Sequence, residues 1–188
     1  MATGVMVMLI GKAYTRLSDH FLHHDKEYEA EITLGHATDS YDAEGTVTQT
    51  SSIIPSLEDI EKAILRFQGT QLQIPPMFSA KKVNGKKLYE LARKGETIER
   101  KAVEVTMRIN LISYCYPSLK IQVACSKGTY IRSLAHDIGL ELNSFGTLTA
   151  LKRIRSGKLT LEKSVDGKAL FDAMTASEIT PFLIDAIP

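Results

Sequence analysis

Alternation of apolar and polar side chains is the feature that most restricts what this chain can fold into. In residues 27–34, EYEAEITL, every second residue is apolar, and three glutamates and a threonine lie between them. A period of two places the apolar set on one face of a β-strand. The same alternation returns in residues 103–109 and 119–125, separated by the turn-prone Tyr116-Pro117-Ser118. We therefore expect a sheet with one buried face, and the last two segments could form a hairpin.

Two segments have the spacing of amphipathic helices. Apolar residues recur at helical spacing in residues 57–67, where Ser56 and Asp59 suit a capping pair and Gly69 suits a C-terminal stop. A second helical pattern, residues 131–142, follows a strand and a short loop. Strand-like pieces at 148–155 and 159–161 and a helical stretch at 168–174 complete the chain. Strands in pairs with few intervening helices predict an α+β fold, with a mixed, largely antiparallel sheet and flanking helices.

Size and composition suit one cytoplasmic domain. The chain has 188 residues, 44% hydrophobic and 24% charged, which is ordinary for a globular protein. Residues 1–10 are apolar but lack a basic leader and are shorter than the roughly 20 residues of a spanning helix. We expect them to form a core segment. Cys115 and Cys125 lie in strand-like runs without metal-ligand spacing, which predicts buried, reduced thiols.

Two groups of metal-ligand residue types have simpler interpretations. His20, His23 and His24 precede Asp25, but no second ligand cluster accompanies them, so we interpret them as surface histidines at a helix end. A run of acidic residues before Gly45 lacks the calcium-loop pattern and is interpreted as a turn between strands. That run comprises Asp39, Asp42 and Glu44. We expect no metal site.

Charge is segregated along the chain, although the net charge is only +1. Residues 19–44 hold eight acidic residues and one lysine, whereas residues 81–101 hold eight basic and three acidic residues. Residues 68–101 also show weak periodicity, with Ile74-Pro75-Pro76 and Asn84-Gly85, and are interpreted as a long excursion from the sheet. Such excursions tend to be functional. Charge runs are more often solvated faces than nucleic-acid sites, so charge alone does not establish RNA or DNA as a partner.

The junction between the strand at 119–125 and the following helix carries candidate chemistry. Residues 127–132, KGTYIR, place the phenol of Tyr130 and the guanidinium of Arg132 two positions apart. No nucleotide-binding glycine motif and no hydrolase triad spacing is present, so a nucleotide cofactor is not supported. From the residues alone, a tyrosine packed in the core and an arginine paired with a nearby carboxylate explain the pattern equally well.

Collinear motifs decide between these interpretations. The segment CSKGTYIRSLAHDIG, residues 125–139, resembles a characteristic segment of the B-type tRNA pseudouridine synthases of bacteria. The same order of motifs continues through ATGVMVMLIGKAY at 2–14, DKEYEAEITLGHATDSYDAEG at 25–45, QIPPMFSAKKVNGKKLYELARKG at 73–95 and LKRIRSG at 151–157. The resemblance covers nearly the whole chain, 1–188, and implies a pseudouridine synthase catalytic fold that isomerises a uridine in the tRNA T-loop without cofactor or metal.

The resemblance also assigns residues. It implies that Tyr28 lies against the flipped uracil and assists proton transfer, that Arg132 pairs with the catalytic carboxylate, and that Tyr130 and Leu151 line the pocket. It further implies a basic RNA-binding insertion at about 70–101 that closes over the tRNA. Its phosphate-binding residues would be Lys81, Lys82, Lys86, Lys87, Arg93 and Lys94.

Where the chain departs from the family, activity is in question. In the family the ATGV motif directly follows the nucleophilic aspartate, so we expect that aspartate upstream of Met1, an N-terminally truncated chain, and an upstream reading frame that encodes Asp-Pro. A C-terminal RNA-binding domain found in many relatives is also not evident. Two hypotheses remain: an isomerase that is inactive as residues 1–188 alone, or a noncatalytic tRNA-binding or RNA-folding protein that uses the same cleft. A guide-RNA-dependent relative is disfavoured, and a monomer is expected.

Overall fold

A seven-stranded mixed sheet organises the molecule in the computed structural model, which describes residues 2–83, 85–172 and 177. The strand order is β1-β10-β2-β9-β8-β5, with β11 added to β10. Only β1 runs parallel to its neighbour, β10, and the remaining pairs are antiparallel. The strands are β1 (Ala2–Gly4), β2 (Lys26–Leu34), β5 (Gly69–Gln73), β8 (Val103–Cys115), β9 (Ser118–Cys125), β10 (Gly146–Ser156) and β11 (Leu159–Thr160). The predicted α+β fold with a largely antiparallel sheet is confirmed.

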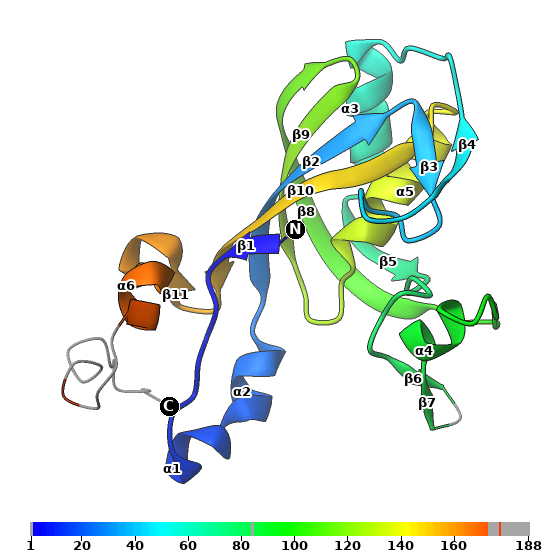
Figure 1. The fold of residues 1–188 in the computed structure, drawn as a ribbon. Helices are drawn as coiled ribbons and strands as arrows, with labels where there is room; N and C mark the ends of the chain where they lie inside the picture. Colours follow the sequence, from blue (N-terminus) through cyan, green and yellow to red (C-terminus); the bar gives the residue numbers. More distant parts are fainter. Residues whose placement is uncertain (1, 84, 173–176, 178–188) are drawn as a thin grey trace.

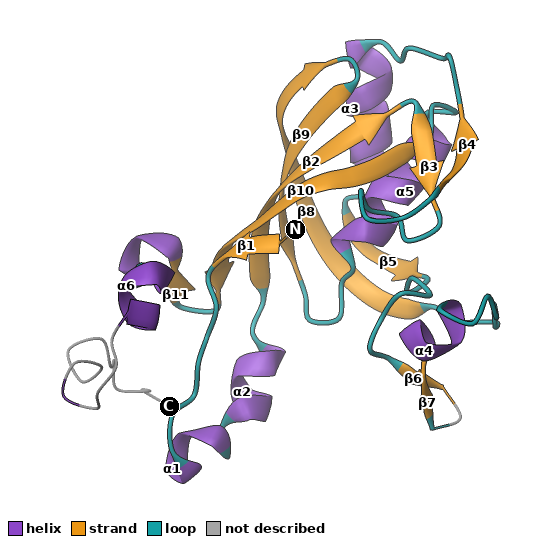
Figure 2. Cartoon of the chain, in the orientation of Figure 1, coloured by secondary structure: helices purple, strands orange, loops and turns teal. Residues whose placement is uncertain are grey.

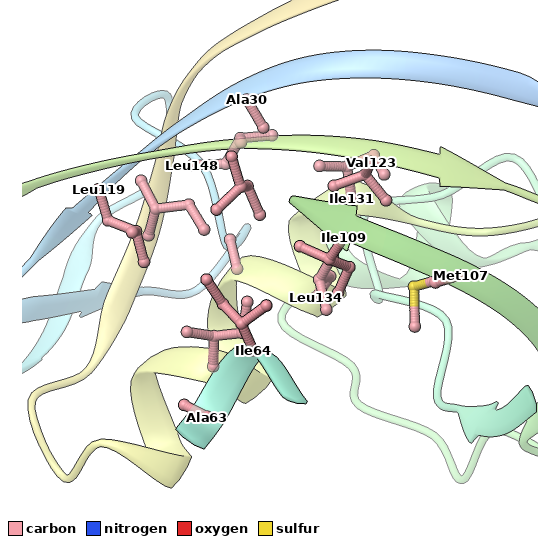
Figure 3. Close-up of a cluster of buried hydrophobic side chains, with 14 of the residues drawn as sticks. Ala30, Ala63, Ile64, Met107, Ile109, Leu119, Val123, Ile131, Leu134 and Leu148 are labelled. Carbon is pink, nitrogen blue, oxygen red and sulfur yellow. The ribbon is translucent and has the colours of Figure 1, made fainter. Parts of the chain in front are cut away.

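One face of this sheet is covered by two helices, α3 (Leu57–Arg66) and α5 (Ile131–Glu141) (Figures 1 and 2). In β2 the buried residues are Ala30, Ile32 and Leu34, the alternate positions predicted from the sequence. Figure 3 shows side chains of the strands and of both helices meeting in one cluster. Burial of one aliphatic side chain contributes about 1.5–3 kcal/mol, so this layer stabilises the fold through many such side chains.

Particular residues set the ends of α3 and the close packing of α5 against β10. At α3, Ser56 Oγ accepts from the Asp59 N–H at 3.2 Å and Asp59 Oδ2 accepts from the Ser56 N–H at 2.9 Å, the predicted capping box. Gly69 lies beyond the helix end, with a φ of +82°, and begins β5. In α5, a Cβ on Gly139 would lie 2.0 Å from the Gly146 backbone nitrogen, so only glycine lets this helix approach β10 so closely.

The predicted hairpin of β8 and β9 is present. The prediction that both cysteines are buried is half right, because Cys125 is buried and Cys115 is exposed. The cause is a register irregularity between Leu111 and Ser113 in β8. An irregularity of this kind changes which face later side chains occupy, so the alternation of residues 103–109 does not continue to Cys115.

Smaller elements surround the sheet. The hairpins are β3 (His36–Thr38) with β4 (Val47–Thr50) and β6 (Lys82–Val83) with β7 (Lys86–Lys87). The short helices are α1 (Lys12–Thr15), α2 (Ser18–His23), α4 (Leu88–Ala92), the 3-10 turn Leu161–Lys163 and α6 (Gly167–Asp172). Residues 173 and 174, the end of the last predicted helix, lie outside the described residues. Figure 1 places α4 with β6 and β7 at one end of the sheet, and α1, α2 and α6 at the other.

Two sequence predictions need correction. The excursion predicted for residues 68–101 begins only at Ile74, because residues 69–73 form β5 at the edge of the main sheet. The prediction of a core segment at residues 1–10 is also wrong, since Val5 is buried but Met6 is 77% exposed. Backbone pairing rather than side-chain burial holds this segment, for the Val5 N–H donates to the Arg153 carbonyl at 2.8 Å. Met1 lies outside the described residues.

Candidate functional site

A pocket of about 600 Å³ opens where the start of α5 meets the turn between β3 and β4 and the segment that precedes α4. Three of the predicted site residues line it: Tyr130, Arg132 and Arg93. The turn contributes Ser40 and Asp42 to its wall. The pocket also includes Phe78 and Tyr89 from the segment around α4. Segments far apart in the sequence thus join at one cavity.

Arg132 connects the two sides of this pocket. Its Nη1 donates to Asp42 Oδ2 at 2.8 Å and to the Ser40 carbonyl at 3.4 Å, and its Nη2 donates to the Phe78 carbonyl at 2.7 Å. The Arg132 side chain keeps 26% of its surface exposed. A guanidinium presents several donors in one plane, so it can hold these acceptors and still face an anion in the pocket.

Asp42 is the site residue that the sequence reasoning missed. It is 6% exposed, and besides Arg132 its carboxylate accepts from Ser40 Oγ at 2.6 Å and from the Glu44 N–H at 3.1 Å. We expected the acidic partner of Arg132 to lie upstream of Met1, whereas Arg132 forms an ion pair with Asp42 in the structure. The predicted turn between strands is present, but one of its carboxylates points inward to the arginine.

Tyr130 lies at the N-terminus of α5 and is fixed through its backbone. Its N–H donates to Gln73 Oε1 at 2.8 Å, and its carbonyl accepts from Gln73 Nε2 at 3.0 Å. Gln73 was quoted in a sequence motif but was given no role. Its burial, with 4% exposed, and these two bonds become visible only when β5 is placed beside α5.

Tyr28 and Leu151 lie on the neighbouring strands β2 and β10, where Tyr28 pairs with Arg153 and Leu151 pairs with Ala30. Both are half-buried against the main core and do not line the pocket around Arg132. Burial raises the pKa of Tyr28, and a hydrogen bond with Arg153 opposes that shift. The phenol of Tyr28 is therefore protonated near neutral pH and can donate a proton.

The six predicted phosphate-binding residues gather around β6, β7 and α4, next to the pocket. Lys87 Nζ donates to the Tyr89 hydroxyl at 3.2 Å. Lys87 Nζ and the Arg93 guanidinium carbon each lie 5.4 Å from the centre of the Tyr89 ring. Lys82, Lys86, Arg93 and Lys94 are exposed, and Lys81 is half-buried. We call residues 81–83 and 85–94 the basic hairpin. Its Tyr89 and Arg93 line the pocket, so this basic segment adjoins the cavity.

Ligands for a metal do not gather in the part of the chain that the structure describes. His20 and His24 are the nearest approach, with their Nε2 atoms 3.3 Å apart. Among the described residues there is likewise no helix long and apolar enough to cross a membrane.

Comparison with known proteins agrees with the motifs. Residues 1–131 match the family described as TruB family pseudouridylate synthase, N-terminal domain. A protein of Protochlamydia amoebophila named tRNA pseudouridine synthase B is 57% identical over 166 residues, which cover 88% of this chain and 63% of that protein. One of the same name from Chlamydia pneumoniae is 52% identical, with 98% of this chain and 78% of that protein covered. The chain therefore belongs to the TruB family of pseudouridylate synthases.

A solved structure shows the same fold. The structure described as a Cbf5-Nop10-Gar1 complex matches with a TM-score of 0.61 at 24% identity, over 85% of this chain and 39% of that one. The chain spans a little under two thirds of the Protochlamydia relative and well under half of this structural neighbour.

Proposed function

We propose that this chain holds a uridine flipped out of the tRNA T-loop in the pocket beside Arg132, as part of a cytoplasmic, monomeric enzyme that isomerises uridine to pseudouridine. The observation that carries the proposal is the joining of Tyr130, Arg132 and Arg93 in one cavity beside a basic hairpin. A base can be modified in this way only after it leaves the loop's stack and enters a pocket.

The reaction itself is balanced without a co-reactant. The bond between C1′ of the ribose and N1 of uracil breaks, C1′ then bonds to C5, and the proton lost from C5 is matched by one gained at N1. No electron leaves or enters, so no redox cofactor is required. What the protein must supply is a nucleophile, a proton carrier and a surface for the turning base.

Tyr130 offers an aromatic ring in the pocket, on which a base can stack. Arg132 can hold a carboxylate ionised by charge-assisted hydrogen bonds. Tyr28 offers a protonated phenol on β2, outside the lining of this pocket. For the nucleophile we propose the aspartate that in the family directly precedes the motif that starts here at Ala2, whose backbone pairs with Leu151.

Phosphate contacts would come from the basic hairpin. Lys82 and Lys86 are exposed on β6 and β7, and Arg93 both lines the pocket and faces the Tyr89 ring. Contacts of this kind position an RNA without reading its sequence.

One observation favours the alternative, a noncatalytic tRNA-binding or RNA-folding protein. Asp42, the carboxylate beside Arg132, already accepts from Arg132, Ser40 and the Glu44 N–H, so it is poorly suited to attack a substrate. Without a second carboxylate in the pocket, the protein would bind RNA but would not isomerise uridine.

The pocket's role can be tested by binding alone. Residues 1–188 should bind a T-stem-loop RNA with the target uridine more tightly than the same RNA with an abasic site there. Stacking of one base is worth about 1–3 kcal/mol, so the preference should be about 5- to 150-fold. Equal affinity for the two RNAs, which carry the same phosphates, would contradict a uridine pocket.

A further inference from the structure

Gln73 makes a two-point contact with the backbone of a pocket residue. Its side-chain amide donates from Nε2 to the Tyr130 carbonyl at 3.0 Å and accepts the Tyr130 N–H on Oε1 at 2.8 Å. The two residues lie 57 positions apart, so this contact joins the edge strand β5 to the start of α5. The N–H and the carbonyl of Tyr130 belong to the two peptide groups on either side of its Cα, so a single side-chain amide holds both of them.

The contact lies in a buried place and at a helix start. Gln73 is 4% exposed, and Tyr130 is the N-cap of α5 without a side-chain cap of its own. The first N–H groups of a helix lack partners within the helix, and Gln73 supplies one. Without the Gln73 amide the Tyr130 N–H would lose its partner, whereas the Tyr130 carbonyl would keep the Leu134 N–H at 3.1 Å. Because an unpaired buried donor is unfavourable, loss of the amide should move Tyr130 or admit water to its N–H.

The segment after Gln73 repeats the attachment. The Ile74 carbonyl accepts from Ser133 Oγ at 2.9 Å, and the Phe78 carbonyl accepts from Arg132 Nη2 at 2.7 Å. Residues 73–78, called the strap below, therefore bond to three residues of the first turn of α5. Ser79 directly follows the strap, and its carbonyl accepts from the N–H of Tyr89 in the basic hairpin at 3.0 Å. The strap is therefore joined to the basic hairpin.

We propose that Gln73 is a positioning residue, which sets the Tyr130 ring for stacking on the flipped uridine. The inference rests on the proposed function and deepens it. It assigns to Gln73 the discrimination for a base in the pocket, and to the basic hairpin the affinity for the RNA backbone.

Two substitutions and a matched control separate these contributions. Gln73→Leu removes both hydrogen bonds, and Gln73→Glu keeps the size and the acceptor but, as a carboxylate, cannot donate to the Tyr130 carbonyl. Gln71 is the control, because it lies on the same face of β5 and its Nε2 donates to the Arg66 carbonyl at 2.6 Å, away from the pocket. Gln71→Leu and Gln71→Glu are made in parallel, and thermal unfolding is recorded for all four.

Binding of the uridine and abasic T-stem-loop RNAs at pH 8 is the measurement. Both Gln73 variants should lose the preference for uridine, a fall of about 5-fold or more, while their affinity for the abasic RNA stays within about 2-fold of the unmodified chain. Both Gln71 variants should keep the preference.

Three results distinguish the failures. A folded Gln73→Glu variant that keeps the full preference overturns the proposal, and so does an equal loss of affinity for both RNAs, which would give Gln73 a purely structural role. If the unmodified chain binds RNA but never prefers uridine, the proposed function fails first and the inference fails with it.

Discussion

Arg132 could be found from the sequence, whereas its partner could not. The KGTYIR run places Tyr130 and Arg132 at the start of a helix, and positions two apart there both reach the same cavity. Asp42 lies 90 positions away and shares its turn with Asp39 and Glu44, so composition gives no reason to choose it. Only the packing of that turn against α5 selects one carboxylate of the three. Gln73 could not be predicted either, because it bonds to the backbone N–H and carbonyl of Tyr130, and a backbone partner leaves no mark in the sequence.

Asp137, on α5, gives a test of burial at the scale of one residue. Burial raises the pKa of Asp137 to about 6, above the value of about 3.9 for an unfolded chain. The folded protein therefore holds this proton more tightly, and the free energy of unfolding falls as pH rises from about 4 to about 6 and stays lower above. Asp137→Asn removes the charge. It should raise the free energy of unfolding by about 1–2 kcal/mol at pH 7.5, less than the full shift because the side chain is partly exposed.

Urea denaturation at pH 7.5 and pH 4 measures this change, with the exposed Glu61→Gln on α3 as the control. The gain from Asp137→Asn should vanish at pH 4, where the native carboxyl is already protonated. A gain of equal size at both pH values would show that charge burial is not its cause.

At the scale of elements, the periodicity of apolar residues predicted those strands and helices that bury one face. β2, the β8 and β9 hairpin and α3 were predicted because their apolar spacing matches the core they pack on. β5 was missed because its sequence, GTQLQ, is mostly polar, and Leu72 is 74% exposed. Pairing of backbone groups with β8 holds that edge strand, and such pairing leaves no pattern in the side chains.

The basic hairpin carries a prediction about salt. If Lys86 and Lys87 contact phosphates, Lys86→Gln with Lys87→Gln should weaken binding of T-stem-loop RNA and reduce the slope of log affinity against log salt by about 1.4–1.8, at about 0.7–0.9 per contact. Lys62→Gln is the control, because Lys62 pairs with Glu58 at 2.6 Å on α3. Filter binding between 50 and 200 mM salt, roughly the range in which such slopes are measured, gives both slopes. An unchanged slope in the double variant would show that these lysines are solvated and do not contact phosphates.

For the whole molecule, the order of the elements predicted the class of sheet correctly. The burial of the N-terminal segment was predicted wrongly. Strands that arrive in pairs predicted a largely antiparallel sheet, as found. The apolar residues 1–10 suggested a core segment, yet Met6 and Met8 are 77% and 62% exposed. An apolar segment without a regular period does not indicate which face of the segment is buried or which layer of the fold it packs against.

The isomerase activity of a hybrid chain would show whether the pocket of residues 1–188 supports catalysis. The residues of the Chlamydia pneumoniae relative that precede its match would be fused to residues 1–188, and pseudouridine measured in a T-stem-loop RNA without added cofactor. We expect the hybrid to convert uridine. We also expect Arg132→Ala to lower its rate about 100-fold or more while RNA affinity changes little, because the arginine serves the reacting carboxylate. A folded hybrid that binds the RNA and forms no pseudouridine would overturn the proposed isomerase and favour a noncatalytic RNA-binding protein.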